Sequence, residues 1–150
     1  MSKEYYISSD TVSKDCKKIA EKLKKTNINF KRIVAVTRGG MLPACLIAQY
    51  LNIREIHTLA LYSYNADGTQ GKITTLVMPN VPDEPQTLFV DDLIDSGNTA
   101  SFLNENYPNS SLCVAYGKNR NIKTVVPATP VPEDAWVIFP WEANPLEECK

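Results

Sequence analysis

The fold is decided by an apolar run that leads into three acidic residues and a small polar turn, Leu88-Phe89-Val90-Asp91-Asp92-Leu93-Ile94-Asp95-Ser96-Gly97-Asn98-Thr99. A short apolar run bounded by turn residues is typical of a buried strand, so residues 87–90 are expected to be one. Residues 99–106 can then form a helix. A strand, a polar turn and a helix in this order are typical of α/β sheets, whose ligands bind beyond the carboxyl ends of the strands.

Strand and helix patterns alternate on both sides of this stretch. Helical periodicity predicts an amphipathic helix over residues 10–25, with Ser9 or Asp10 as its N-cap, and an apolar helix over residues 41–51. Apolar and β-branched runs predict further strands at 32–36, 55–61, 73–77, 112–116 and 136–139. The alternation predicts a mostly parallel α/β sheet flanked by helices. We expect one domain over residues 1–150, since that length is typical of a single core.

Composition excludes several classes of function. The chain has 43% apolar and 22% charged residues, which is typical of a globular protein. Its net charge of −1 gives no positive field for nucleic acid or an acidic membrane surface, so a small-molecule substrate is favoured. No run approaches the roughly 18 apolar residues of a transmembrane segment, and the start lacks the apolar core of a signal peptide. We therefore expect a cytoplasmic protein.

Cysteine and histidine usage limits the available chemistry. Cys16, Cys45, Cys113 and Cys149 form no Cys-x-x-Cys pair, which argues against a zinc site or a redox dithiol. His57 is the only histidine, so a Ser-His-Asp triad and multi-histidine metal sites are excluded. Acid-base work is left to carboxylates, lysine or tyrosine.

Two parts of the deciding stretch have different physical uses. The turn from Ser96 to Thr99 can offer backbone N–H groups and hydroxyls to a phosphate, with Gly97 allowing close approach before a helix N-terminus. Asp91 and Asp92 suit a sugar diol or a hydrated magnesium ion, and their side chains should point to opposite faces. The alternative for these residues is a solvated acidic strand end with an N-cap serine.

The complete string resembles the diphosphate-ribose signature of the type I phosphoribosyltransferases, in which two acidic residues precede Asp-Ser/Thr-Gly-x-Thr. The resemblance implies phosphoribosyl pyrophosphate as a substrate and Mg²⁺ as a cofactor. It implies that the ribose hydroxyls bind at Asp91 and Asp92, with the metal at Asp92. The 5′-phosphate would bind at the turn, through Ser96, Gly97, Asn98 and Thr99.

A second loop follows the strand at 32–36 and reads Thr37-Arg38-Gly39-Gly40. The resemblance implies that Arg38 and Gly39 wrap the pyrophosphate, with a non-proline cis peptide at Arg38-Gly39. Taken alone, Arg-Gly-Gly is an ordinary turn.

Within the family, the layout from about Tyr5 to Trp141 is most like the bacterial xanthine-guanine enzymes. The resemblance implies a small C-terminal hood that binds the purine. Lys118 would donate to the purine O6, Trp136 would stack on the base and the Val137 carbonyl would meet its 2-position. The alternatives are a surface lysine at a strand end and a tryptophan packed in the core.

The polar, glycine-containing segment that begins at Ser63 and Tyr64 resembles a flexible loop that closes over the reaction centre. Gln70 stands where the bacterial relatives carry an arginine, and Lys72 is the candidate substitute. The alternative is a long hairpin. The tail after Glu142 departs from the relatives.

Asp95 is the candidate catalytic residue, since the resemblance places its carboxylate beside the N7 proton of the base. The alternative role for Asp95 is to cap the following helix. The implied reaction joins guanine, xanthine or hypoxanthine to phosphoribosyl pyrophosphate, in a dimer or tetramer. Two other functions stay open: a regulator that binds phosphoribosyl pyrophosphate or a nucleotide without catalysis, and a phosphoribosyltransferase for adenine, orotate or uracil.

Overall fold

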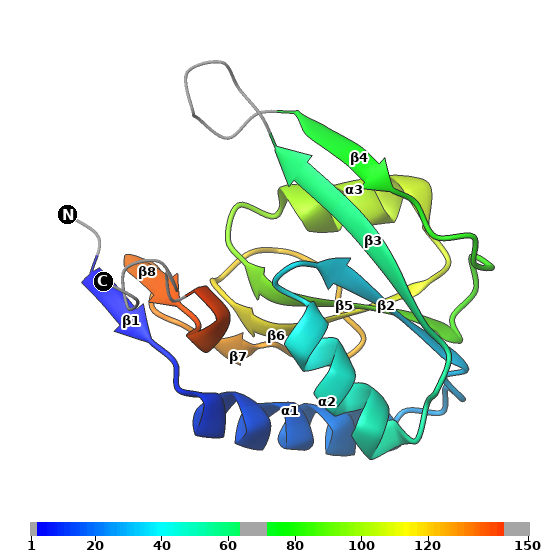
Figure 1. Cartoon of the computed structure of the whole chain (residues 1–150), viewed down its shortest axis with the longest axis horizontal. Coiled ribbons are helices and arrows are strands. Elements are labelled where there is room, and N and C mark those ends of the chain that lie inside the picture. Colours follow the sequence, from blue (N-terminus) through cyan, green and yellow to red (C-terminus); the bar gives the residue numbers. More distant parts are fainter. Residues whose placement is uncertain (1–2, 64–71, 143–150) are drawn as a thin grey trace, which may run out of the picture.

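The chain forms a six-stranded sheet with helices on both faces and a separate two-stranded sheet at one end (Figure 1). The structure is a computed structural model that describes residues 3–63 and 72–142. The helices are α1 (Ser9–Lys24), α2 (Met41–Leu51), α3 (Asn98–Asn106) and a 3₁₀ turn (Pro140–Glu142). The strands are β1 (Lys3–Tyr6), β2 (Arg32–Thr37), β3 (Ile56–Ser63), β4 (Ile73–Val77), β5 (Thr87–Ile94), β6 (Ser111–Gly117), β7 (Thr129–Pro130) and β8 (Ala135–Ile138).

The large sheet has the strand order β4-β3-β2-β5-β6-β7. Every neighbouring pair in it is parallel except β3 and β4, which run antiparallel. The carboxyl ends of β2, β5 and β6 therefore meet at one edge, where parallel sheets bind their ligands. The expected α/β fold with a mostly parallel sheet is confirmed.

Helix α1 covers the sheet because its apolar residues recur on one side. Its buried side chains are Val12, Cys16, Ile19, Ala20 and Leu23. Complete burial of a side chain the size of leucine stabilises a fold by about 1.5–3 kcal/mol. The N-cap is Ser8, whose Oγ accepts a hydrogen bond from the Thr11 N–H at 3.1 Å, and not Ser9 or Asp10.

Helix α2 lies beside α1 on the same face and carries no charged residue. Pro43 is tolerated because it falls in the first turn, and the helix ends where Asn52 adopts the left-handed conformation at φ 54°. Within the described residues, no helix has the length and apolar content needed to cross a membrane.

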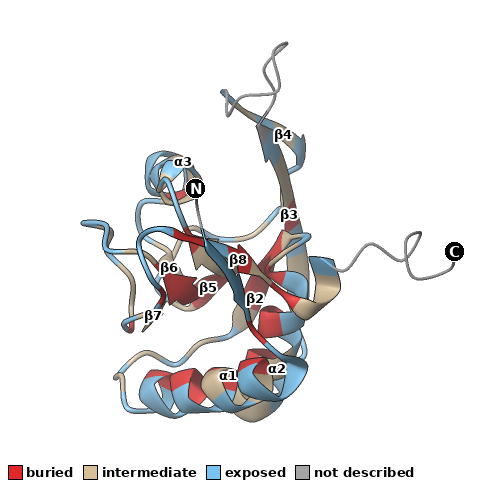
Figure 2. Cartoon of the chain, turned by 90° about the vertical axis from the view of Figure 1, so that its left-hand side faces the viewer, coloured by how far each residue is buried: buried red, intermediate tan, exposed pale blue. Residues whose placement is uncertain are grey.

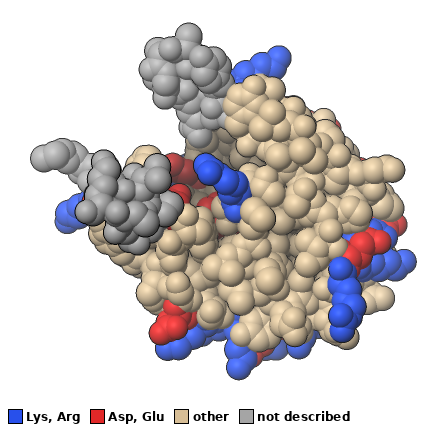
Figure 3. Space-filling model, in the orientation of Figure 1, with Lys and Arg blue, Asp and Glu red and all other residues tan. Residues whose placement is uncertain are grey.

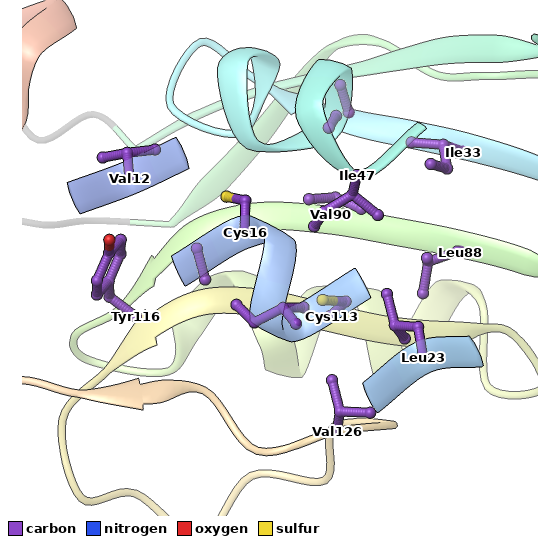
Figure 4. Packing of buried hydrophobic residues seen from close by; sticks show 14 of the residues in the cluster. Val12, Cys16, Leu23, Ile33, Ile47, Leu88, Val90, Cys113, Tyr116 and Val126 are labelled. Atoms are coloured by element: carbon purple, nitrogen blue, oxygen red, sulfur yellow. The ribbon is translucent and has the colours of Figure 1, made fainter. Parts of the chain in front are cut away.

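Two apolar clusters lie on opposite faces of the large sheet. The larger cluster packs α1 and α2 onto the side chains of Ile33, Leu88 and Val90, as the labelled sticks in Figure 4 show. The smaller cluster includes Phe89 of β5 and Leu103, the one buried residue of α3. Figure 2 shows the buried residues concentrated in the sheet and on the inner sides of α1 and α2. Adjacent β5 residues thus face different layers, as strand geometry requires.

The two-stranded sheet joins the two ends of the described chain. β1 pairs in parallel with β8, in the register Lys3 to Ala135 and Tyr6 to Ile138. Phe139 then stacks on Trp141 with ring centroids 4.6 Å apart, and its ring also meets Tyr116 of β6 at 5.6 Å. We call β1, β8 and the 3₁₀ turn the hood; it lies at the end of the sheet toward which β5 and β6 point (Figure 1).

The structure corrects the sequence-based elements in three places. The expected C-terminal hood also contains β1, a segment with no predicted role. Strand β5 continues to Ile94 instead of ending at 90, because its pairing with β6 persists through Ile94 and Gly117. The short strand β7 lies in a proline-containing segment for which no strand is predicted, and it pairs at the sheet edge, where proline is tolerated.

The cysteines are expected to differ in reactivity. Burial raises the pKa of both Cys16 and Cys113 to about 12, so little reactive thiolate is present at pH 8. Cys45 is exposed on α2. Brief alkylation of the folded protein with iodoacetamide, read by peptide mass mapping, should modify Cys45 and spare Cys16 and Cys113. Equal labelling of all three would contradict the packing of α1 on β6.

Candidate active site

The site forms where β2, β5 and β6 end, beneath the hood. Ile94 and Gly117, the last residues of β5 and β6, are register partners. The Lys118 N–H continues this pairing by donating to the Ile94 carbonyl at 3.0 Å. The segments that follow the two strands, which begin with Asp95 and Lys118, therefore start side by side.

The turn after β5 forms one wall of a small cavity of about 80 Å³. The predicted site residues that line this cavity are Asp91, Asp95, Ser96, Gly97, Asn98 and Thr99. Gly97 has φ 89°, which strongly favours glycine, and α3 begins directly after it without a side-chain cap. The Asn98 N–H donates to Ser96 Oγ at 3.3 Å, and the helix dipole at this end of α3 favours an anion.

Asp91 and Asp92 point to opposite faces, as expected. Asp91 lines the cavity on the α3 side, and its Oδ1 accepts a hydrogen bond from the Asp92 N–H at 2.8 Å. The Asp92 carboxylate lies instead beside Gly39, on the side of α2. The two carboxylates therefore face different parts of the site.

Burial raises the pKa of both carboxyl groups. The shift is large for Asp91, where the Asp92 charge adds to it, and at Asp92 the charge of Glu142 on the hood contributes. A cation or a hydroxyl donor at this pair would offset the penalty of burying negative charge. Carboxylate oxygens suit Mg²⁺, which usually takes one or two protein ligands and completes its shell with water and phosphate. The pair fits such an ion, and the described residues hold no group of three or more metal-binding side chains.

The loop after β2 places its two glycines against β5. A Cβ on Gly39 would collide with the Asp92 carboxylate, and a Cβ on Gly40 would collide with the carbonyls of Val36 and Val90. Arg38 is exposed at the start of this loop. The cis peptide is Thr37-Arg38, one bond before the expected Arg38-Gly39. The glycines are needed for close approach to β5, and the cis bond precedes them.

Lys118 and Asp95 form an ion pair between the two strand ends. The Lys118 Nζ lies 2.8 Å from Asp95 Oδ1, with side chains 11% and 53% exposed. Lys118 is therefore not a solvated surface lysine. Asp95 does not cap α3, since the N-cap residue is Gly97 and makes no side-chain hydrogen bond.

The hood places the aromatic candidate at the surface. Trp136 on β8 is 63% exposed, which excludes the core role for this residue, and the next residue, Val137, is buried. Trp141 by contrast stacks on Phe139 and packs against the main core.

The predicted closing loop lies mostly outside the described residues. Tyr64 and Gln70 belong to that part, while Ser63 ends β3 and Lys72 is exposed just before β4. The pyrophosphate contact expected from Lys72 stays a prediction.

Two residues near the site were missed by the sequence analysis. The Ile122 side chain packs over Gly97, where a Cβ would lie 2.8 Å from Ile122 Cδ1. Glu133 forms an ion pair with Arg120 at 2.8 Å and accepts a hydrogen bond from the Asn119 N–H. Neither Ile122 nor Glu133 belongs to a sequence motif. Each is identified only by its contacts in the folded structure.

Comparison with known proteins agrees with this geometry. A family model described as a phosphoribosyl transferase domain matches residues 6–143. A xanthine-guanine phosphoribosyltransferase of Roseobacter denitrificans is 32% identical in an alignment of 153 positions, gaps included, that spans 93% of this chain and 86% of the relative.

Solved structures share the fold at lower identity. The xanthine-guanine-hypoxanthine phosphoribosyltransferase of Helicobacter pylori superposes with a TM-score of 0.77 at 20% identity, over 99% of this chain and 98% of that one. A hypothetical protein of Neisseria gonorrhoeae with bound ppGpp gives a TM-score of 0.75 at 22% identity, over 99% and 94%.

The strand-end carboxylates, the turn before α3 and the glycine loop suit the binding of a phosphorylated small molecule at the carboxyl edge of a parallel sheet. Given the family match and the relative, this chain belongs to the phosphoribosyltransferase family, where its place is among the purine phosphoribosyltransferases.

Proposed function

We propose that the protein transfers the phosphoribosyl group of phosphoribosyl pyrophosphate to a 6-oxopurine, namely guanine, xanthine or hypoxanthine, and releases pyrophosphate. The observation that carries this proposal is the Lys118–Asp95 pair, which sets a donor and an acceptor 2.8 Å apart beside the anion-binding turn. If the ribose of phosphoribosyl pyrophosphate lay at Asp91, a purine beside it would contact the side chains of Lys118 and Asp95.

The two loops at the strand ends would bind the phosphate groups. The turn from Ser96 to Thr99 would take the 5′-phosphate, because its residues line a cavity at the start of α3. Arg38 and the Gly39 N–H would meet the pyrophosphate. Asp91 would accept from the ribose hydroxyls, and Asp92 would hold Mg²⁺. When bound, Mg²⁺ supplies positive charge to the departing pyrophosphate.

Lys118 would select 6-oxopurines because its ammonium group carries no hydrogen-bond acceptor. An ammonium group only donates hydrogen bonds, so it matches the O6 carbonyl and leaves a 6-amino group unpaired. Trp136 would stack on the ring from the hood, and the Val137 carbonyl would accept from groups at the 2-position.

Asp95 would serve as the acid-base group. Its carboxylate is half-exposed and paired with Lys118, so a bound base can reach it once the lysine turns toward O6. It would accept the N7 proton, and its charge would favour the positive charge that develops as the ribose bond to pyrophosphate breaks.

A direct assay tests the proposed reaction. The purified protein is incubated with phosphoribosyl pyrophosphate, Mg²⁺ and one of guanine, xanthine, hypoxanthine, adenine, orotate or uracil, and nucleotide and pyrophosphate are quantified. Formation of a 6-oxopurine nucleotide with matching pyrophosphate supports the proposal. Turnover with adenine, orotate or uracil alone would overturn the proposed base.

A Lys118→Met variant is expected to lose selection for the 6-oxo group. Methionine keeps much of the length and apolar stem of lysine but cannot donate to O6, so kcat/KM for the preferred 6-oxopurine should fall about 10- to 100-fold. KM for phosphoribosyl pyrophosphate should change little. Steady-state kinetics with each substrate varied in turn checks this, and equal losses for both substrates would contradict the assigned role.

A nucleotide-binding regulator is the second candidate. The Neisseria gonorrhoeae structure of the same fold holds ppGpp, so a protein of this fold can bind a nucleotide. In the assay above, a folded protein that binds phosphoribosyl pyrophosphate without turnover of any base would favour this candidate.

We infer that the described chain acts as one phosphoribosyltransferase domain and assembles with further copies of itself. The face of α2 and β3 shown in Figure 3 is mostly uncharged, and Met41, Leu42, Ile56 and Tyr62 are exposed on these elements. An uncharged apolar face suits a symmetric contact, in which each residue meets a like environment. The cytoplasmic location stays a prediction.

A further inference from the structure

The two side chains assigned to the purine come from separate parts of the fold. Lys118 directly follows β6 of the large sheet, whereas Trp136 lies on β8 of the hood. A base can contact both only if the distance between these two segments is fixed. The question is which contact fixes it.

Glu133 connects the two segments. Its Oε2 lies 2.8 Å from Arg120 Nη1, and its Oε1 accepts a hydrogen bond from the Asn119 N–H. Arg120 also donates to the Asn119 carbonyl at 2.9 Å, which closes a small network. Glu133 thus bonds the two residues that directly follow Lys118. Glu133 itself lies three residues before Trp136 in the sequence.

β8 is also held on the main core by Ala135 and Val137, which are buried on either side of Trp136. β1 pairs along β8, and the Phe139 ring packs between Trp141 and Tyr116 at the far end of that strand. The Val131 N–H donates to the Gly117 carbonyl at 3.1 Å, before the turn that carries Glu133. In the described ranges, the hydrogen bonds between residues 118–124 and residues 132–135, which lead into β8, are those of Glu133.

We propose that Glu133 is a positioning residue for the purine: it ties the segment after Lys118 to the start of β8, sets the width of the slot between Lys118 and Trp136, and so controls base affinity. The inference rests on the proposed function, because it takes Lys118 and Trp136 as the two walls of the base site. It assigns Glu133 no contact with either substrate.

Charge supports the same arrangement. The hydrogen bonds from Arg120 and from Asn119 lower the pKa of Glu133, and the nearby Lys118 charge lowers it further. Glu133 is therefore ionised at neutral pH. Its negative charge stays near Lys118 after that lysine leaves Asp95 to meet the base.

The contribution of the Arg120–Glu133 pair to the free energy of unfolding is expected to be small. A loss of base binding in a Glu133 variant can therefore be separated from a loss of folding. Arg120 and Glu133 are 35% and 53% exposed, and exposed pairs of this kind add little to stability. Their effect on binding can be larger, because small displacements of binding groups are costly. A Glu133→Ala variant should fold normally and bind the base poorly.

The experiment compares three variants with the wild type. Glu133→Ala should raise KM for guanine about 10-fold and leave KM for phosphoribosyl pyrophosphate within about 2-fold. Glu133→Gln keeps an acceptor for the Asn119 N–H. Its KM for guanine should therefore lie between those of the wild type and Glu133→Ala. Glu55→Ala is the matched control, because Glu55 is also 53% exposed and pairs with Arg32 at 2.6 Å, at the opposite end of the sheet. This control should leave both KM values unchanged.

A binding measurement separates the possible failures. The dissociation constant of GMP, measured by calorimetry, should rise for Glu133→Ala and stay constant for Glu55→Ala. Unchanged GMP affinity and guanine KM in Glu133→Ala would overturn this inference alone. Equal losses for both substrates would show a general structural role and also overturn it. A wild type that neither turns over a purine nor binds GMP would overturn the proposed function together with this inference.

Discussion

The Asp95→Ala variant is expected to lose about 10²- to 10⁴-fold in kcat, the usual contribution of a positioned acid-base group. The Asp95 carboxylate is half-exposed and forms an ion pair with Lys118. Its removal keeps the core packing but leaves Lys118, which is 11% exposed, without this partner, so the thermal unfolding midpoint should fall modestly while the fold is kept. Turnover with the preferred 6-oxopurine and a circular dichroism melt measure the two effects separately.

Two further variants define what Asp95 contributes. Asp95→Asn keeps an oxygen that can accept from Lys118 but removes the charge, so it should be nearly as inactive as the alanine variant if the proton and the charge matter. Asp83→Ala is the control, because Asp83 bonds Asn109 and Ser110 in a loop that plays no part in the site. It should lower stability by about 1 kcal/mol and leave kcat unchanged. Wild-type turnover in Asp95→Ala would refute the acid-base role.

Gly40→Ala is expected to have the second large effect, through the backbone. The added Cβ would meet the carbonyl oxygens of Val36 and Val90, neither of which can rotate away. Overpacking of this kind destabilises a protein by about 1–3 kcal/mol. Because the loop must shift, KM for phosphoribosyl pyrophosphate should also rise, on the order of 10²-fold. Urea unfolding and substrate-dependent kinetics check the two parts.

Gly117→Ala is the control variant with which the effects of Gly40→Ala on stability and KM are compared. Its Cβ would meet the Ala128 Cβ at 3.2 Å, a side-chain contact that a small shift can relieve. We expect a smaller loss of stability and a KM for phosphoribosyl pyrophosphate within a few-fold of the wild type. If Gly40→Ala behaved no worse than Gly117→Ala, the tight packing of the glycine loop on β5 would be wrong.

The parts predicted well from the sequence are those governed by local patterns. Residues 41–51 and 73–77 gave a helix and a strand with the bounds observed, because apolar content and turn residues mark both ends. The opposite orientation of Asp91 and Asp92 followed from strand geometry alone. The roles of the individual site residues stay predictions that the proposed variants test.

The parts that sequence reasoning missed depend on contacts between distant segments. β1 is four residues long with no buried side chain, so it has no apolar pattern to reveal it before β8 is in place. Glu133 and Arg120 look like ordinary surface charges until the fold brings them within 2.8 Å. The cis bond precedes Arg38 instead of following it, a distinction that an Arg-Gly-Gly sequence does not encode.

The pairing of β1 with β8 also determines the order in which parts of the protein can fold during translation. The residues from β2 to β6 are complete once Gly117 has left the ribosome, and they include the turn proposed to bind phosphate. β1 has been made long before this, yet it has no partner strand until residues 135–138 emerge. The half of the site that would hold the sugar phosphate can therefore form during translation, whereas the half that would hold the base is assembled last.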